Sequence, residues 1–242
     1  MSLYASSNDN EKSAPAELMD LLKEVGPFAL IGLLVALVFL ALFAKLSEEV
    51  FSQEITTLDK NVSLWVHSFA SPPLDFFFNA LSTLGGPVGV GILTISALAL
   101  LFFRHQARNA WRLIIVMAGG LLLNQVLKLL FHRSRPELWP GLHFAGFSFP
   151  SGHATMSLCL FGMFAWLGWV HLHNDALRIS LVVLMVVLVF LVGLSRIYLG
   201  AHYLSDVVAG YLSAAVWLAA VLSGTDIYRR FREGTHPKPA PK

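Results

Sequence analysis

The chain has 242 residues, of which 56% are hydrophobic and 13% are charged. Soluble domains carry about 25% charged residues, so this deficit, with a mean hydropathy of +0.66, indicates an integral membrane protein with one folding unit. The net charge of +2 and the lack of a basic cluster with interleaved aromatics give no sign of nucleic-acid binding. The single cysteine, Cys159, excludes a disulfide framework and a cysteine-based metal site.

Residues 1–26 are expected to form a segment that precedes the membrane spans. Within it, residues 13–25 place four apolar side chains on one helical face, Leu18, Leu21, Leu22 and Val25. With charged residues opposite and Pro15 in the first turn, this spacing predicts a short amphipathic helix on the membrane surface. The segment is acidic and lacks the basic start of a cleaved signal peptide.

Six apolar segments follow, each long enough for a helix that crosses a bilayer, which takes about 20 residues. We expect these spans at residues 27–46, 74–103, 111–131, 152–170, 178–194 and 203–222. The second is interrupted by Gly85-Gly86-Pro87, which predicts a kink or an interfacial turn. Between the first two spans, one helical stripe of apolar residues predicts a second surface helix, with Leu58, Val62, Trp65, Val66 and Phe69.

The predicted fold class is therefore all-α, a polytopic membrane protein with six transmembrane helices and short amphipathic surface helices. Residues 27–222 form the membrane domain, and residues 223–242 form a basic, proline-rich tail. Six spans place both termini on one side, and most of the 17 Lys and Arg residues fall on that side. By the positive-inside rule, we expect cytoplasmic termini.

Charged and polar residues recur in the otherwise apolar stretch 128–206. A Lys, Arg or Asp at the centre of a spanning helix costs about 2.5 to 3.5 kcal/mol. A single one of these cations is explained as a residue at the end of a span whose charge reaches the membrane interface. The whole set instead indicates a functional site. Its cations are Lys128, Arg135 and Arg196, and arginine binds phosphate through two parallel hydrogen bonds.

Two further features of this stretch suit phosphate chemistry. Ser151 and Gly152 open a helix, whose free backbone N–H groups attract anions. His202 and Asp206 are four residues apart and therefore share a helical face, so the carboxylate can fix the tautomer of the ring. His153 begins a different helix and is expected to face His202 from the other side of the phosphate.

Three motifs carry a family resemblance. They are Lys128-x6-Arg135-Pro136, Pro150-Ser151-Gly152-His153, and Ser195-Arg196-x5-His202-x3-Asp206. Together they resemble the signature of the type 2 phosphatidic acid phosphatase family, which also includes soluble class A acid phosphatases and vanadium haloperoxidases. No signature position departs from the pattern.

The resemblance implies a role for each matched residue. His202 would attack phosphorus and form a phosphohistidine, and His153 would protonate the leaving oxygen and then assist attack by water. Asp206 would orient His202. The phosphate would be bound by five further residues, Lys128, Arg135, Ser151, Gly152 and Arg196.

No metal or cofactor is expected, because a two-metal phosphatase needs clustered carboxylates. Between Lys128 and Asp206 the only other acids are Glu137 and Asp175, and Asp175 is expected on the opposite side of the membrane. The resemblance is strongest to bacterial undecaprenyl diphosphate and phosphatidylglycerophosphate phosphatases. It implies a lipid phosphate substrate, including phosphatidate, in the bacterial cytoplasmic (inner) membrane. The bias of Lys and Arg, which favours cytoplasmic termini, predicts that the site faces the periplasm or extracytoplasmic space.

Other functions share parts of this pattern. A lipid phosphotransferase would use the same chemistry with an acceptor hydroxyl in place of water. A transporter would also place charges within the membrane, but it predicts repeated halves that the sequence lacks. Six spans argue against a haloperoxidase. The lipid tail, the headgroup and the oligomeric state stay open.

Overall fold

The structure, a computed structural model, describes residues 26–136 and 145–234. The amphipathic helix expected at residues 13–25 lies outside the described residues, as do Glu137, Trp139, Phe144 and the tail beyond residue 234. The described residues form eight helices and no strand. They are α2 (Pro27–Phe51), α3 (Thr56–His67), α4 (Pro72–Leu84), α5 (Pro87–Phe103), α6 (Ala107–Phe131), α7 (Gly152–His171), α8 (Asp175–Tyr198) and α9 (Leu204–Gly234).

The expected all-α membrane fold is confirmed. Within the described ranges, five helices are long and apolar enough to span a membrane, namely α2, α6, α7, α8 and α9. Counted as one bent span, α4 and α5, which meet at 47°, bring the number of candidate spans to six. Because Pro87 has no N–H, it cannot continue α4 and instead begins α5, which explains the break predicted at Gly85-Gly86-Pro87.

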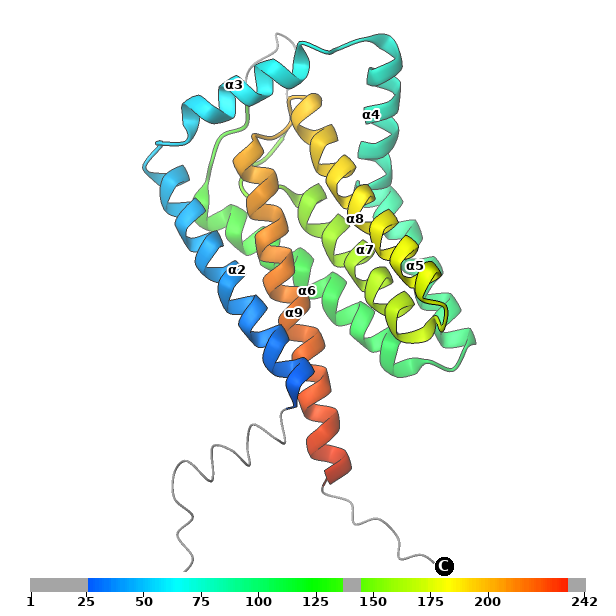
Figure 1. Ribbon diagram of the computed structural model, residues 1–242. Helices are drawn as coiled ribbons and strands as arrows, with labels where there is room; N and C mark the ends of the chain where they lie inside the picture. Colours follow the sequence, from blue (N-terminus) through cyan, green and yellow to red (C-terminus); the bar gives the residue numbers. More distant parts are fainter. Residues whose placement is uncertain (1–25, 137–144, 235–242) are drawn as a thin grey trace, which may run out of the picture.

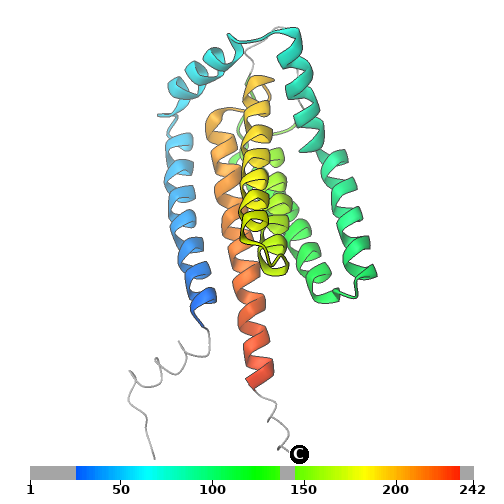
Figure 2. The same ribbon diagram turned by 45° about the vertical axis from the view of Figure 1, so that its right-hand side comes forward.

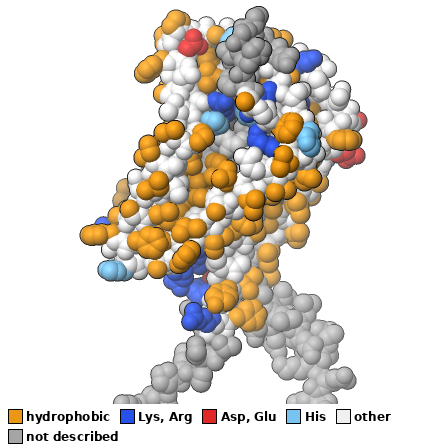
Figure 3. Space-filling view, turned by 180° about the vertical axis from the view of Figure 1, so that it is seen from behind, with side chains coloured by type: hydrophobic (Ala, Val, Ile, Leu, Met, Phe, Trp, Pro, Cys, Tyr) orange, Lys and Arg blue, Asp and Glu red, His pale blue; other side chains and the backbone are white. Residues whose placement is uncertain are grey.

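The helices form a bundle with α7 inside it (Figure 1). Helix α7 packs against α6, α8 and α9, and α2 runs along α9. Their contact is a core of fully buried side chains that includes Leu113 and Val116 of α6, Leu160 and Met163 of α7, and Val192 of α8. Many apolar side chains instead face outward in a band across the middle of the molecule, as expected for contact with lipid (Figure 3).

One end of the bundle is covered by α3, which crosses over it between α2 and α4 (Figures 1 and 2). The start of α2 and the end of α9 lie at the opposite end. The loop after α6, the start of α7 and the connection from α8 to α9 all lie at the end near α3 (Figure 1). This end therefore brings together the segments that carry the three sequence motifs.

Two details differ from the sequence predictions. Helix α9 continues to Gly234, so residues 223–234 are helix rather than tail; ion pairs of Asp226 with Arg229 and Arg230, one turn away, stabilise this extension. In α3, the face turned inward carries Asp59, Ser63 and Val66.

The predicted apolar stripe of α3 is only partly buried. Leu58, Trp65 and Phe69 are more than half exposed, while Val66 alone is buried. In a membrane protein, apolar side chains lose little by facing lipid, so the polar side of a helix can face the protein interior.

Candidate active site

The residues singled out by the motifs lie at the covered end of the bundle, each at a helix end or in a connection. Lys128 lies in the last turn of α6, and Arg135 lies in the loop that follows. Ser151–His153 lie at the start of α7, and Arg196 lies in the last turn of α8. His202 lies in the α8–α9 connection, and Asp206 lies in the first turn of α9. Helix packing thus converts three distant motifs into one site.

His202 lies between a carboxylate and a guanidinium. Its Nδ1 is 3.5 Å from Oδ2 of Asp206, and its Nε2 is 3.3 Å from Nη1 of Arg135. The side chains of His202 and Asp206 are 2% and 0% exposed. A proton on Nδ1 would face Asp206 and leave the lone pair of Nε2 directed toward the cation. This arrangement is consistent with the predicted contact between the ring of His202 and the carboxylate of Asp206.

His202 is held in its neutral form. Burial lowers its pKa to about 4, although the hydrogen bond and the negative charge of Asp206 act in the opposite direction. Only the neutral ring has a lone pair on Nε2, so the form of His202 that predominates at pH 7 is the nucleophilic one.

Asp206 is fixed by groups that the sequence motifs do not include. Nη1 of Arg133 donates to its Oδ1 at 2.7 Å, and the backbone N–H of Tyr203 donates to its Oδ2 at 2.9 Å. Nη2 of the same Arg133 donates to Oδ2 of Asp59, on α3, at 2.8 Å. Asp59 also accepts hydrogen bonds from the backbone N–H and the hydroxyl of Ser205, at 3.0 and 2.5 Å.

The sequence motifs do not predict this network, Asp59–Arg133–Asp206, because neither Asp59 nor Arg133 belongs to one of them. A weak signal existed, because Asp59, Ser63 and Val66 follow an i, i+4, i+7 spacing that marks one face of α3. The pairing of this face with residues far along the chain is not visible in the sequence.

The three cations of the motifs are held largely by neutral oxygen atoms. Lys128 Nζ donates to the carbonyl of Phe147 at 2.5 Å, and Arg135 donates to the carbonyls of Gly146 and Ala201 at 3.1 and 3.0 Å. Arg196 Nη1 donates to the hydroxyl of Ser82 on α4. Hydrogen bonds to neutral acceptors orient a cation without cancelling its charge.

The start of α7 is anchored to its neighbours. The backbone N–H of Ser151 donates to the carbonyl of Asp206 at 2.9 Å. Nδ2 of the buried Asn124 donates to the carbonyl of Pro150 at 3.3 Å and to Oγ1 of Thr155 at 3.1 Å. These bonds fix the helix N-terminus, with Gly152 and His153 in its first turn, against α6 and α9. His153 lies within electrostatic range of Arg196, His202, Arg135 and Lys128.

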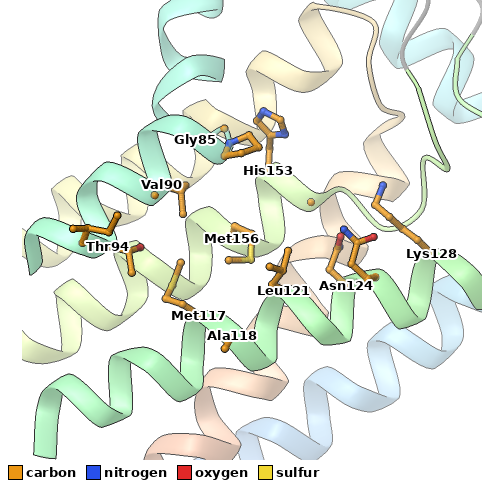
Figure 4. A pocket seen from close by; sticks show the side chains of 16 residues that line it. Gly85, Val90, Thr94, Met117, Ala118, Leu121, Asn124, Lys128, His153 and Met156 are labelled. Atoms are coloured by element: carbon orange, nitrogen blue, oxygen red, sulfur yellow. The ribbon is translucent and has the colours of Figure 1, made fainter. Parts of the chain in front are cut away.

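A cavity of about 450 Å³ extends from this site between α5, α6 and α7. Figure 4 shows His153 and Lys128 toward one end, and Met117 and Thr94 toward the other. Its wall is mostly apolar, with Val90, Leu121 and Met156 among the lining side chains. The cavity therefore joins the polar site to the part of the bundle that lies within the apolar band.

The bend between α4 and α5 shapes the mouth of this cavity. A Cβ atom at Gly86 would lie 3.2 Å from Nε2 of His153, so glycine allows the two segments to approach closely. Among the residues that the structure describes, no three His, Cys, Asp or Glu side chains gather as a metal site.

Comparisons with known proteins agree with this geometry. Residues 109–229 match the family model described as the PAP2 superfamily. Over 192 residues the chain is 28% identical to phosphatidylglycerophosphatase B of Bacillus subtilis, and this match covers 79% of this chain and 95% of that protein. Over 122 residues it is 37% identical to lipid A 4'-phosphatase of Rhizobium leguminosarum, covering 46% of this chain and 52% of that protein.

Two solved structures share the fold. One is the transmembrane PAP2 type phosphatidylglycerolphosphate phosphatase from Bacillus subtilis, with a TM-score of 0.72, 26% identity, and coverage of 85% of this chain and 99% of that chain. The other is LpxE of Aquifex aeolicus, with a TM-score of 0.56, 24% identity, and coverage of 68% of this chain and 94% of that chain. The matched family region, residues 109–229, contains all three sequence motifs.

Proposed function

The chain belongs to the PAP2 superfamily, and we propose that it hydrolyses the terminal phosphate of a membrane lipid phosphate or diphosphate through a phosphohistidine at His202. The observation that carries this proposal is the placement of the buried, neutral His202 between Asp206 and Arg135. One ring nitrogen faces a carboxylate that holds its proton, and the other faces a cation that would bind the phosphate.

The proposed reaction has two steps. In the first, Nε2 of His202 attacks phosphorus, and the bond from phosphorus to the lipid oxygen breaks. His153 gives its proton to that oxygen, and the lipid alcohol or monophosphate leaves. In the second step, neutral His153 takes a proton from water, whose oxygen attacks phosphorus and breaks the P–N bond. Phosphate is released, and both histidines return to their starting states.

The cations act on the transferred group in both steps. Negative charge spreads over the phosphate oxygens as the transfer proceeds. Lys128, Arg135 and Arg196 approach from three different elements. The N–H of Gly152 at the start of α7 and the buried hydroxyl of Ser151, which has no hydrogen-bond partner among the described residues, supply a further anion site. Because these groups are fixed before the substrate arrives, they stabilise the transition state without reorganisation.

The cavity between α5, α6 and α7 supports a lipid substrate. Its polar end meets His153 and Lys128, and its apolar wall continues into the membrane-spanning part of the bundle. A lipid whose phosphate reaches the site can place part of its tail there, at about 25 cal/mol for each Å² of apolar surface buried. Such a wall discriminates poorly between prenyl and acyl tails, so we propose activity on several lipid phosphates.

Among these lipids we propose a preference for undecaprenyl diphosphate over phosphatidylglycerophosphate and phosphatidate. The bias of Lys and Arg favours cytoplasmic termini, which would put the site on the outer side of the membrane. Prenyl diphosphate released during cell-wall synthesis is available on that side, whereas the glycerolipid phosphates are made on the cytoplasmic side.

The deciding experiment is phosphate release by the purified protein in detergent, with EDTA present, from these three lipids. We expect release to persist in EDTA, because fixed cations already stabilise the phosphate, and vanadate to inhibit. Recovery of lost activity on addition of Mg²⁺ would contradict a metal-independent reaction. A kcat/KM ten times higher for either glycerolipid than for undecaprenyl diphosphate would contradict the prenyl preference but not the assignment as a lipid phosphatase. Formation of a phosphorylated acceptor lipid instead of free phosphate would assign the phosphotransferase reaction.

A further inference from the structure

Arginine side chains gather at the end of the bundle opposite His202, where α6 begins and α9 ends (Figure 3). Five of them line two adjoining cavities, Arg108, Arg112, Arg229, Arg230 and Arg232. The cavities share three of these residues, and Asp226 is the one acidic residue along their walls in the described part of the chain. Among the described residues that line these cavities, arginines outnumber acidic residues, and the reaction at His202 does not use them.

The charge of Asp226 is already engaged. Its two carboxylate oxygens accept hydrogen bonds from Arg229 at 2.6 Å and from Arg230 at 2.9 Å. The buried Arg112 instead donates to neutral groups, to Oγ1 of Thr225 at 3.0 Å and to Oδ1 of Asn109 at 3.3 Å. Arg112 also lies over the ring of Trp166, 4.9 Å from its centre. A bound phosphate would supply the negative charge that this arrangement lacks.

The larger cavity, of about 610 Å³, is lined by aromatic and apolar side chains as well as by arginines. Its lining includes Trp111 and Tyr228, which are 59% and 67% exposed, and the outward-facing Ile115 one turn further along α6. Exposed tryptophan and tyrosine are typical of the membrane interface, and Ile115 continues the wall toward the apolar band. Basic pockets between spanning helices bind the headgroups of anionic lipids.

We propose that this cavity binds the phosphate headgroup of an anionic membrane phospholipid, with the acyl chains along the exposed apolar face of α6 and α9. The headgroup would contact Arg108 and Arg232 at the rim and Arg112 deeper inside. The proposal does not depend on the reaction at His202.

The test measures lipid binding to the full-length protein in detergent by native mass spectrometry, with dioleoyl-phosphatidylglycerol and dioleoyl-phosphatidylcholine, which carry identical chains. We expect phosphatidylglycerol to be retained at a concentration about tenfold lower than phosphatidylcholine. The double variant Arg108→Gln/Arg232→Gln should lose about tenfold in affinity for phosphatidylglycerol, since a hydrogen bond to a charged group contributes about 1.5 to 3 kcal/mol. Both residues are exposed, so the variant is expected to fold.

A matched control is Arg104→Gln/Arg178→Gln, which removes the same charge at the same end but outside both cavities, and it should bind as the wild type does. Equal retention of both lipids by the wild type, or equal binding by the two double variants, would overturn the proposal. Loss of binding in Lys128→Ala/Arg135→Ala would place the lipid at the catalytic site and also overturn it. Displacement by millimolar inorganic phosphate would assign the cavity to the free anion instead.

Discussion

Arg133 joins two buried carboxylates, with Nη1 2.7 Å from Asp206 and Nη2 2.8 Å from Asp59. Asp206 in turn faces Nδ1 of the catalytic candidate His202. The position of Asp206 therefore depends on α3, a helix that contributes no residue to the family motifs. The ring of Tyr203 covers the guanidinium of Arg133, at 4.7 Å from its centre, and restricts it further.

The first prediction is that Asp59 and Arg133 position the nucleophile. Asp59→Asn keeps the shape of the side chain but removes the charge that holds Arg133, so Asp206 and His202 should become less well oriented. We expect kcat to fall about 10- to 100-fold with little change in KM, as for residues that orient a reacting group without contacting the substrate. Arg133→Lys should have a similar effect, because one ammonium group cannot bridge both carboxylates in the same geometry.

The control for these variants is Asp75→Asn. Asp75, on α4, accepts a hydrogen bond from the hydroxyl of Tyr198 at 2.6 Å and takes no part in the network of Arg133. Steady-state kinetics and thermal unfolding should be measured for all three variants. If Asp59→Asn retains the wild-type kcat, or if it changes only the unfolding temperature, the positioning role is wrong.

A second prediction separates the nucleophile from its orienting carboxylate. His202→Ala should lower kcat by at least about 10³-fold, because no neighbouring group replaces the attacking nitrogen. Asp206→Asn should retain a small activity that exceeds the activity of His202→Ala, since the ring remains but its tautomer is no longer fixed. Acid-labile phosphoprotein, trapped by rapid quench, should form in the wild type and be absent in His202→Ala.

His67→Ala serves as the control for these two variants. His67 belongs to α3 at the same end of the bundle, and its Nδ1 lies 3.4 Å from the carbonyl of Tyr198. Near-normal turnover is expected there. Turnover above a few per cent of the wild-type rate in His202→Ala would show that another group attacks phosphorus.

The pH profile gives a third prediction. Because burial lowers the pKa of His202 to about 4, its neutral form persists far below the usual pKa of a histidine. Because His202 keeps its nucleophilic form down to mildly acidic pH, kcat/KM should persist there and decline with a midpoint near pH 4. Asp206 favours the charged ring, so Asp206→Asn should lower this pKa further and move the acid limb to lower pH.

The same substrate must be used for both profiles, so that its own ionisation affects them equally. An acid limb near pH 6.5 in the wild type would indicate an unperturbed histidine and contradict the burial argument. A limb that moves to higher pH in Asp206→Asn would show that the carboxylate does not act on the ring as described.

The sequence was sufficient for the all-α membrane fold and for selecting motif residues that meet at one end of the bundle, while the roles of those residues stay predictions. Apolar segments of about 20 residues can satisfy their backbone only as helices in a membrane, and the i, i+4 spacing of His202 and Asp206 fixes their common face. The role of Asp59 could not be predicted, because its partner Ser205 is 146 residues away and the contact depends on how α3 folds over the bundle. The cavity between α5, α6 and α7 is likewise not visible in the sequence, because its lining comes from separate helices and from the bend at Gly85-Gly86-Pro87.

A fourth prediction concerns orientation. In a Cys159→Ala background, single cysteines at Ser68, after α3, and at His105, between α5 and α6, should react from opposite sides of the membrane. Both positions are exposed and lie at opposite ends of the bundle. We expect Ser68→Cys to react with an impermeant maleimide in intact spheroplasts, and His105→Cys only after lysis. The reverse pattern would place the site on the cytoplasmic side.

The last prediction tests whether the cavity beside His153 holds the lipid tail. Gly91 lines this cavity from α5, and a Cβ atom at that position would meet nothing within 4 Å. The variant Gly91→Leu should therefore fill part of the cavity without a clash in the backbone. We expect kcat/KM to fall about tenfold for a long-tailed lipid phosphate, which corresponds to about 1.4 kcal/mol of lost tail contact, and to change little for a short-chain phosphate.

Gly224→Leu is the matched control for this variant. Gly224 is in α9, a Cβ atom there also meets nothing within 4 Å, and it does not line the cavity. Each substitution replaces glycine by leucine within a helix, so each should gain a similar helix-propensity term of about 1 kcal/mol. The difference between the two variants in kcat/KM, measured with long- and short-chain substrates in one detergent, isolates occupation of the cavity. An equal effect of Gly91→Leu on both chain lengths would show that the tail lies elsewhere.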